Sequence, residues 1–437
     1  MMTFTSAPGG PRALTLLAGL VLAAVFAQPA PAATADEVEA RLNALSAQVA
    51  ELQAELAELK AQQQVIAATP ATENASASDT VFTAGAAPSK QVEWFGYGEL
   101  NYSRPNSNSA NTTADVGRFV LGASYRFDEK TRFVSELEIE HAVSSAADPG
   151  EVAVEQAYIE RRLGDSIYTK MGLFLIPVGM LNENHEPTRY YGVFRNFVDT
   201  AIIPTTWREG GFAVRGDTSG GLRWDVGIST GFDLSKWDAT VGAGLEKPLG
   251  SIHQELARAR ANDLSSFGAL NYTGVPGLRL GASVFTGEAS QGQPGFGNNR
   301  ITLWEGHVRW NPGNWDLSAL YARGHISNTR PINLKLLGNP TLIPESFFGG
   351  YAEAAYRATL PNAWTLAPFA RYERFNTASG YASLGAGLTP DPLDDETVLA
   401  AGANLEIAPG VVVKLDYLRF DRDAGNDRFD LGVGYQF

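Results

Sequence analysis

The feature that most limits the fold of this chain is a two-residue alternation of apolar and polar side chains that recurs from residue 91 to the end. In the last segment, apolar side chains occupy every second position, at Phe429, Leu431, Val433, Tyr435 and Phe437. A β-strand points successive side chains to opposite faces. The alternation therefore predicts strands with one apolar and one polar face.

Sixteen segments show this alternation or a close variant of it, and most have nine to twelve residues. A strand that crosses a membrane at a tilt needs ~9–11 residues, whereas strands of soluble sheets usually have ~5–6. The predicted strands are 92–103, 116–127, 131–142, 151–162, 166–175, 210–217, 221–232, 265–273, 277–286, 301–311, 314–325, 346–357, 363–374, 397–407, 411–421 and 427–437.

The gaps between these segments alternate between short and long, as 128–130 and 312–313 contrast with 176–209 and 233–264. Transmembrane barrels have this pattern, with tight periplasmic turns and longer external loops. The faces opposite the apolar ones carry many charges, which a dry core cannot accept but a water-filled lumen solvates. The sequence thus predicts an all-β fold, a 16-stranded antiparallel transmembrane β-barrel, wide enough for an aqueous channel.

The first 90 residues lack the two-residue alternation and show other patterns. An apolar stretch before small residues predicts a signal peptide over 1–32, with an uncleaved anchor as the alternative. Residues 33–66 contain an unbroken heptad seam, which predicts a coiled-coil oligomerisation helix in the periplasm; a helix packed on its own barrel is the alternative. Residues 67–90 are rich in Ala, Ser and Thr and predict a flexible linker.

Composition and motifs argue against an enzyme. The chain has no cysteine, which excludes disulfides, zinc–thiolate sites and cysteine nucleophiles, and its charge of −14 argues against nucleic acid as a partner. A G-x-S-x-G match places Ser229 within a predicted strand rather than at a strand–helix turn. The five histidines form no i,i+4 pair. We therefore expect no catalytic activity, no cofactor and no metal site.

Several motifs resemble the phosphate-selective porin family: Glu155-Gln-Ala-Tyr-Ile159, Gly172-Leu-Phe-Leu-Ile-Pro-Val-Gly179, Asn184-His-Glu-Pro187, Ile203-Pro-Thr-Thr-Trp-Arg-Glu-Gly-Gly211 and the terminal Tyr435-Gln-Phe437. The resemblance implies a homotrimer of sixteen-stranded barrels in the outer membrane of a Gram-negative-type cell, each narrowed by an inward-folded third loop. It also implies passive diffusion of small hydrophilic solutes and ions. Specific members bind phosphate through pore arginines, but here acidic residues interrupt the arginines, which favours a general porin.

By this resemblance, residues 176–209 are the constriction loop. The segment is also longer than ordered loops usually are without a function. We expect loop charges to face strand charges across the pore. The predicted pore-lining set is Arg118, Arg132, Glu136, Glu138, Lys170, Glu183, His185, Glu186, Arg189, Arg195, Arg208 and Arg215.

A second set of arginines occupies positions in the alternation that are predicted to face lipid. Arg323, Arg374 and Arg419 each follow a tyrosine by two residues, near the long-loop ends of their strands. Arginine binds phosphate groups bidentately, so these side chains are predicted to contact lipopolysaccharide. The alternative is that they turn inward or cap a neighbouring strand.

Two rival functions stay open at this point. One is a structural tether that couples the outer membrane to the cell wall through the periplasmic coiled coil, which a fully plugged lumen would favour. The other is an outer-membrane enzyme, which would need a Ser/His/acid constellation on the lipid face.

Overall fold

The computed structural model describes residues 92–143, 145 and 149–437. The predicted signal peptide (1–32), coiled-coil helix (33–66) and linker (67–90) lie outside the described residues. The strands are β1 (Val92–Pro105), β2 (Thr113–Arg126), β3 (Thr131–Glu140), β4 (Val152–Arg162), β5 (Ile167–Leu175), β6 (Arg208–Asp217), β7 (Leu222–Ser229), β8 (Ser265–Val275), β9 (Leu278–Glu288), β10 (Arg300–Trp310), β11 (Trp315–Ile326), β12 (Ser346–Tyr356), β13 (Ala358–Thr359), β14 (Thr365–Gly380), β15 (Glu396–Ala408), β16 (Val411–Phe420) and β17 (Arg428–Gln436).

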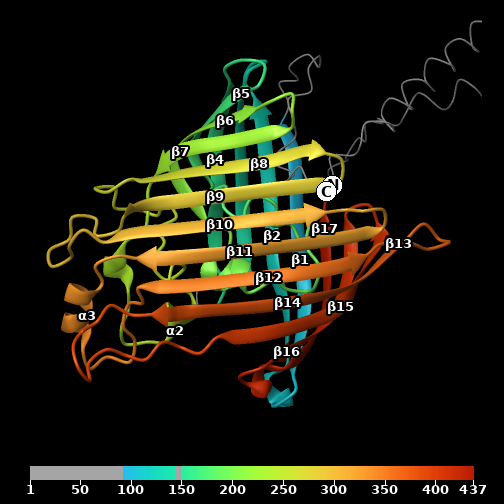
Figure 1. Ribbon diagram of the computed structural model, residues 1–437. Helices are drawn as coiled ribbons and strands as arrows, with labels where there is room; N and C mark the ends of the chain where they lie inside the picture. The colour runs from blue at the N-terminus through green and yellow to red at the C-terminus, as the bar shows by residue number, and fades with distance from the viewer. Residues whose placement is uncertain (1–91, 144, 146–148) are drawn as a thin grey trace, which may run out of the picture. The chain divides into compact units, whose positions relative to one another are not determined.

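These strands form one antiparallel sheet that closes on itself (Figure 1). Each strand pairs with its neighbours in sequence, and β1 pairs with both β2 and β17, with Leu100 opposite Val433 at the closure. The two-residue β13 continues β12 along the same edge of β14. The seventeen described strands therefore occupy sixteen positions in the wall, which confirms the predicted sixteen-stranded barrel.

Some strands are longer than the alternation predicted. β14 runs on to Gly380, six residues beyond its predicted end, because it pairs there with Ser346 at the start of β12. β2 starts at Thr113 rather than residue 116, since Thr113 pairs with Ser103 of β1. Ladder hydrogen bonds extend these hairpins past the point where the apolar alternation stops, so the side-chain pattern alone underestimates them.

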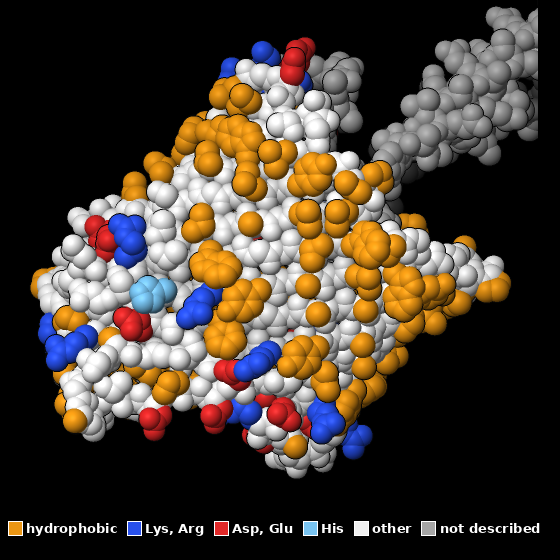
Figure 2. Space-filling model, in the orientation of Figure 1, with side chains coloured by type: hydrophobic (Ala, Val, Ile, Leu, Met, Phe, Trp, Pro, Cys, Tyr) orange, Lys and Arg blue, Asp and Glu red, His pale blue; other side chains and the backbone are white. Residues whose placement is uncertain are grey.

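The wall is apolar outside and polar inside. Along β16, Leu415 is 44% exposed on the outer face, whereas its neighbours Lys414 and Asp416 are 2% exposed. On the face seen in Figure 2, hydrophobic side chains spread over the strand wall, and charged ones gather mostly near the loops. The burial pattern of a soluble protein is thus inverted, as a lipid-facing barrel requires.

Short and long connections lie at opposite ends of the barrel. The chain ends at the short-turn end, where Gly96 and Phe437 exchange backbone hydrogen bonds of 3.0 and 2.9 Å. None of the helices in the described residues is long and apolar enough to cross a membrane. The helical turns belong to the long connections: η3 (Ser109–Asn111), η4 (Val198–Ile202), η5 (Leu234–Lys236), α2 (Ala243–Glu246), α3 (Arg330–Leu336) and η6 (Ala424–Asn426).

The outward position of Leu415 gives a direct test of the apolar belt. We expect Leu415→Arg to destabilise the folded barrel in lipid vesicles by roughly 2–4 kcal/mol, because a cation near the middle of the bilayer loses its hydration. Equilibrium unfolding by guanidinium, followed by tryptophan fluorescence, measures this change. Leu415→Val keeps the site apolar and is the matched control. Equal stabilities for the two variants would contradict a lipid-facing Leu415.

Candidate functional site

The connection between β5 and β6, residues 176–207, crosses the lumen, and we call it the crossing loop. Three of its backbone N–H groups donate to side chains on the far wall: Gly192 to Asn404 Oδ1 of β15 (3.2 Å), Val193 to Asp416 of β16 (2.6 Å) and Phe197 to Glu373 of β14 (2.6 Å). These strands lie about half-way round the sheet from β5 and β6. The loop is therefore held at both its root and its far end.

The path of the crossing loop is set by an asparagine and a glycine. Asn182 donates to the carbonyls of Ile176 (2.7 Å) and Trp207 (2.8 Å) and accepts from the Trp207 N–H (2.7 Å), which joins the two ends of the loop. Gly192 has φ +85°, and a Cβ there would lie 2.8 Å from Asp416 Oδ2. Glycine thus permits the close approach that the Val193–Asp416 hydrogen bond needs.

Apolar side chains fill the space on one side of the crossing loop. Trp207 lies 4.4 Å from Phe285 of β9 and 5.1 Å from Phe232, measured between ring centroids. Burial and aromatic contacts of this kind stabilise strongly. The cluster also includes Phe174, Ile176, Val178, Val198, Ile202, Ile203, Leu234, Leu249, Ile252, Phe267, Ile326, Ile332, Ile343 and Phe347. Part of the lumen is therefore a packed core rather than open space.

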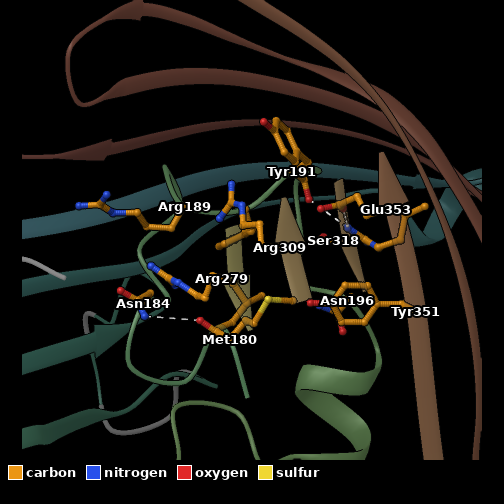
Figure 3. A pocket seen from close by; sticks show the side chains of 13 residues that line it. Met180, Asn184, Arg189, Tyr191, Asn196, Arg279, Arg309, Ser318, Tyr351 and Glu353 are labelled. Carbon is orange, nitrogen blue, oxygen red and sulfur yellow. Dashed lines mark hydrogen bonds and ion pairs between the residues drawn. The ribbon is translucent and has the colours of Figure 1, made fainter. Parts of the chain in front are cut away.

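A pocket that shares Met180 and Tyr351 with this apolar cluster lies beside the crossing loop (Figure 3). It contains four arginines and one carboxylate, and the rest of its lining is mainly amides, hydroxyls and tyrosines. Figure 3 shows the side chains of Arg189, Arg279 and Arg309 near one another in the lining. The lining comprises Met180, Leu181, Asn184, Arg189, Tyr190, Tyr191, Asn196, Arg279, Arg309, Ser318, Tyr351, Glu353 and Arg371, and we call it the arginine pocket.

Two of the pocket arginines are held rigidly by carboxylates of the strands. Arg309 binds Asp316 through two nitrogens, at 2.8 and 2.5 Å. Arg371 contacts Glu353 (2.9 Å) and Glu373 (2.7 Å), and it also donates to the carbonyl of Tyr191 in the crossing loop (3.1 Å). Guanidinium groups fixed in this way have little freedom to lose when they meet an anion.

Apart from Arg195, the predicted arginine and lysine pore cations outside the pocket lie in ion pairs. Arg118 is also bound to the crossing loop, because it donates to the His185 carbonyl at 2.5 Å. Arg195 donates to Thr206 within the loop. The pairs are Arg118 with Glu99, Arg132 with Glu160, Lys170 and Arg215 with Glu183, and Arg208 with Glu255. Of the predicted pore-lining cations, Arg189 is the one that lines the arginine pocket.

The predicted residues His185, Glu136 and Glu138 are buried between the crossing loop and the wall of β1 to β4. His185 there contacts Glu155, a residue that the sequence prediction left out of the site. Glu186 is likewise buried, at 1% exposed. The contacts of His185 with Glu155 and Tyr97 hold this part of the loop against the wall.

The sequence prediction missed three pocket arginines, Arg279 of β9, Arg309 of β10 and Arg371 of β14. Their inward phase was visible in the alternation, so the strands themselves gave the signal. The sequence did not reveal where the far end of the crossing loop lies, and that position decides which inward-facing arginines line the pocket. A loop without periodicity does not reveal which strands it reaches.

Several groups of the crossing loop titrate abnormally because they are buried. Burial raises the pKa of Asp199 in η4 to about 6, although a hydrogen bond from Asn196 opposes the shift. Burial, followed by the charge of Glu99, raises the pKa of Tyr190. Burial and the neighbouring Arg118 lower the pKa of the Arg195 guanidinium. Asp199 therefore changes its charge near pH 6.

The lipid-phase arginines are exposed on the outer face of the wall, as their alternation predicted: Arg323 on β11, Arg374 on β14 and Arg419 on β16. Arg374 also pairs with Asp395 in the following loop. Ser229 ends β7, and its buried hydroxyl has no hydrogen-bond partner among the described residues. Among the described residues, Ser229 of the G-x-S-x-G match therefore has no hydrogen bond to a histidine.

The barrel, its inverted polarity and its crossing loop define the fold of outer-membrane porins. OmpF of Salmonella typhi, solved in complex with daunomycin, matches with a TM-score of 0.54 at 14% identity, over 80% of this chain and 98% of that one. An anion-selective porin from Comamonas acidovorans matches with a TM-score of 0.50 at 12% identity, over 79% of this chain and 99% of that one. These neighbours are channels rather than enzymes.

At the level of sequence, an uncharacterised protein of Aquifex aeolicus is 30% identical over 359 residues, which cover 80% of each chain. The chain belongs to the same family as this Aquifex protein. No family model matches the sequence. The resemblance to the phosphate-selective porins therefore stays a prediction.

The raised pKa of Asp199 predicts a pH-dependent attachment of the crossing loop. The docked loop favours the protonated carboxyl, so this contribution to stability is complete below pH 3.8 and is lost as the pH rises through about 6. We expect amide protection in Val198–Ile202, corrected for intrinsic exchange, to fall by up to about 3 kcal/mol over that range. Hydrogen–deuterium exchange measures this change.

Two variants control this experiment. Asp199→Asn should remove most of the pH dependence, because the amide carries no charge at any pH in the range. Asp238→Asn changes an exposed loop aspartate and should keep the wild-type pH profile. A wild-type profile in Asp199→Asn would show that another group controls the loop.

Proposed function

We propose that this protein is an outer-membrane porin, a water-filled channel for passive diffusion of small hydrophilic solutes and ions. The observation that carries the proposal is a closed sixteen-position barrel with an apolar exterior and a charged interior. Such a wall satisfies its backbone hydrogen bonds internally and turns its charged side chains to the lumen rather than to lipid. The likeness to solved porins supports the same function.

We further propose that the arginine pocket is part of the conducting path and favours anions. The lining holds four arginines and one carboxylate, and Asp316 and Glu373 beside it pair with two of the four. The arginines are Arg189, Arg279, Arg309 and Arg371, and the lining carboxylate is Glu353. Rings of Arg or Lys lower the energy of an anion in a pore, and fixed guanidinium groups do so without rearrangement. The net charge of −14 does not oppose this, because the local lining sets selectivity, not the whole chain.

The test is a change of ion selectivity. We expect the double variant Arg189→Glu with Arg279→Glu to lower the chloride-to-potassium permeability ratio several-fold, because two attractive charges become repulsive to anions. Reversal potentials in a salt gradient across a planar bilayer measure this ratio. The matched control, Arg323→Glu with Arg419→Glu, reverses two charges on the outer face and should leave the ratio unchanged. No shift in the pocket variant would remove the arginine pocket from the conducting path.

The homotrimer remains a proposal that rests on the family resemblance. The tether function rests on the coiled coil of residues 33–66, outside the described residues, and no described feature favours it. A channel that conducts in bilayers would separate the porin from a tether that is silent.

We also propose that the outer-face arginines bind the phosphates of lipopolysaccharide. Arg323, Arg374 and Arg419 lie on the same outer surface, and each has an exposed tyrosine two residues before it. Arg419 pairs with Leu399 across the β15–β16 ladder, and Arg374 pairs with Thr397 on the other side of β15. The two arginines are therefore at nearly the same height in the wall.

The matching prediction concerns lipid that co-purifies with the protein. The triple variant Arg323→Ser, Arg374→Ser and Arg419→Ser should retain several-fold less lipopolysaccharide, because each lost guanidinium removes bidentate phosphate contacts. Mass spectrometry of the purified protein measures the lipid. A control with Lys130, Arg161 and Arg162 changed to Ser removes three cations near the short turns. Equal lipid in the two triple variants would rule out a specific site at the three outer-face arginines.

A further inference from the structure

We propose that a divalent transition-metal ion binds between the crossing loop and the barrel wall, at Glu136, Glu155 and His185. His185 belongs to the loop, Glu136 to β3 and Glu155 to β4. One ligand atom from each lies within 4.8 Å of the others, and all three residues are buried. Tyr97 of β1 adds a phenol oxygen to the same point. We call these four residues the loop–wall cluster.

The donor atoms converge more closely than separate hydrogen bonds require. His185 Nε2 lies 2.6 Å from Glu155 Oε1 and 2.6 Å from Tyr97 Oη, and Tyr97 Oη lies 3.2 and 3.0 Å from the two Glu155 oxygens. His185 Nε2 carries at most one hydrogen, so it can donate to only one of the two oxygens that lie 2.6 Å from it. Four donors around a tetrahedral Zn²⁺ at ~2.1 Å lie ~3.4 Å apart. The close His185, Glu155 and Tyr97 contacts would lengthen to reach this spacing, and Glu136, within 4.8 Å of the other ligand atoms, would move nearer.

The histidine is oriented as metal ligands usually are. Its Nδ1 lies 2.9 Å from the carbonyl of Asn182, which can only accept a hydrogen bond. Nδ1 therefore donates to this carbonyl, and Nε2 is directed at Glu155, where it becomes available as a metal ligand once an ion displaces its proton. Asn182 is itself fixed by its hydrogen bonds to Ile176 and Trp207. This second layer holds the imidazole in place before any ion arrives.

The charge around the cluster favours a cation. Glu138 is 3% exposed and has no hydrogen bond or ion pair among the described residues, and its charge is felt by Glu155. Glu136 has a hydrogen bond from the neutral amide of Gln156 (2.8 Å). The nearby Arg118 is bound to Glu99 and to the His185 carbonyl. Three buried carboxylates are costly without more positive charge, which a divalent ion supplies.

The donor set indicates which ion binds. Imidazole selects Zn²⁺, Fe²⁺ or Ni²⁺ over Mg²⁺ and Ca²⁺, and the carboxylates complete a nitrogen–oxygen shell that suits Zn²⁺. The ion would join one crossing-loop residue to three strands. It would thereby hold the root of the loop against the wall, independently of whether the pore conducts anions.

The test uses untagged, lipid-reconstituted protein that has been stripped with a chelator and titrated with ZnCl₂. We expect one Zn²⁺ per chain by calorimetry, and a zinc X-ray absorption spectrum with one imidazole and otherwise oxygen ligands. His185→Gln and Glu155→Gln should each weaken binding ~100-fold, and Tyr97→Phe ~10-fold. His253→Gln is the matched control, because His253 also contacts a glutamate, Glu255, at 3.2 Å but lies outside the cluster.

Heat-modifiable migration on gels confirms that each variant is folded. An all-oxygen zinc shell in the wild-type protein would overturn the proposal without any variant. So would the absence of saturable one-to-one binding, or wild-type affinity in folded His185→Gln. In that case the cluster is a protonated histidine paired with Glu155, and nothing changes for the porin function.

Discussion

Every backbone N–H and C=O in the wall must find its partner within the wall, because the hydrocarbon of a bilayer offers none. The chain meets this constraint by pairing each strand with two neighbours and by returning β17 to β1. Closure removes every free sheet edge, and an even number of strands lets every pair in the closed wall be antiparallel. Side-chain identity then matters mainly for which face meets lipid and which meets water.

The closed wall has an apolar exterior and a polar interior, the reverse of a soluble protein. The crossing loop is attached to polar side chains of that interior. Carboxylates of the far wall, such as Asp416 and Glu373, accept hydrogen bonds from loop N–H groups that would otherwise be unsatisfied. A dry apolar interior could not hold an irregular loop in this way, since each unpaired buried N–H is costly. The charged lumen is thus both the solvent-facing surface and the attachment surface for the loop.

The alternation predicted the strands, their faces and the order of short and long connections, because a two-residue period is a local property. It also placed Arg279, Arg309 and Arg371 on the inner face, as it did Arg118 and Arg132. The alternation did not show which of these inward-facing arginines line the arginine pocket. Ion pairs occur in both groups, but of these five arginines only Arg279, Arg309 and Arg371 line the arginine pocket. The phase of the alternation predicts which face of the wall a side chain occupies, but it does not predict which residue that side chain contacts.

The sequence by itself determined a sixteen-strand barrel with an apolar exterior, since periodicity and segment length act within each strand. Only the tertiary structure decided where the crossing loop ends, which arginines it leaves facing a pocket, and that His185 meets Glu155 and Tyr97. Those contacts join residues far apart in the chain and follow no period. They arise because the loop crosses the lumen and reaches β1 and β4, which consecutive hairpins hold near one another.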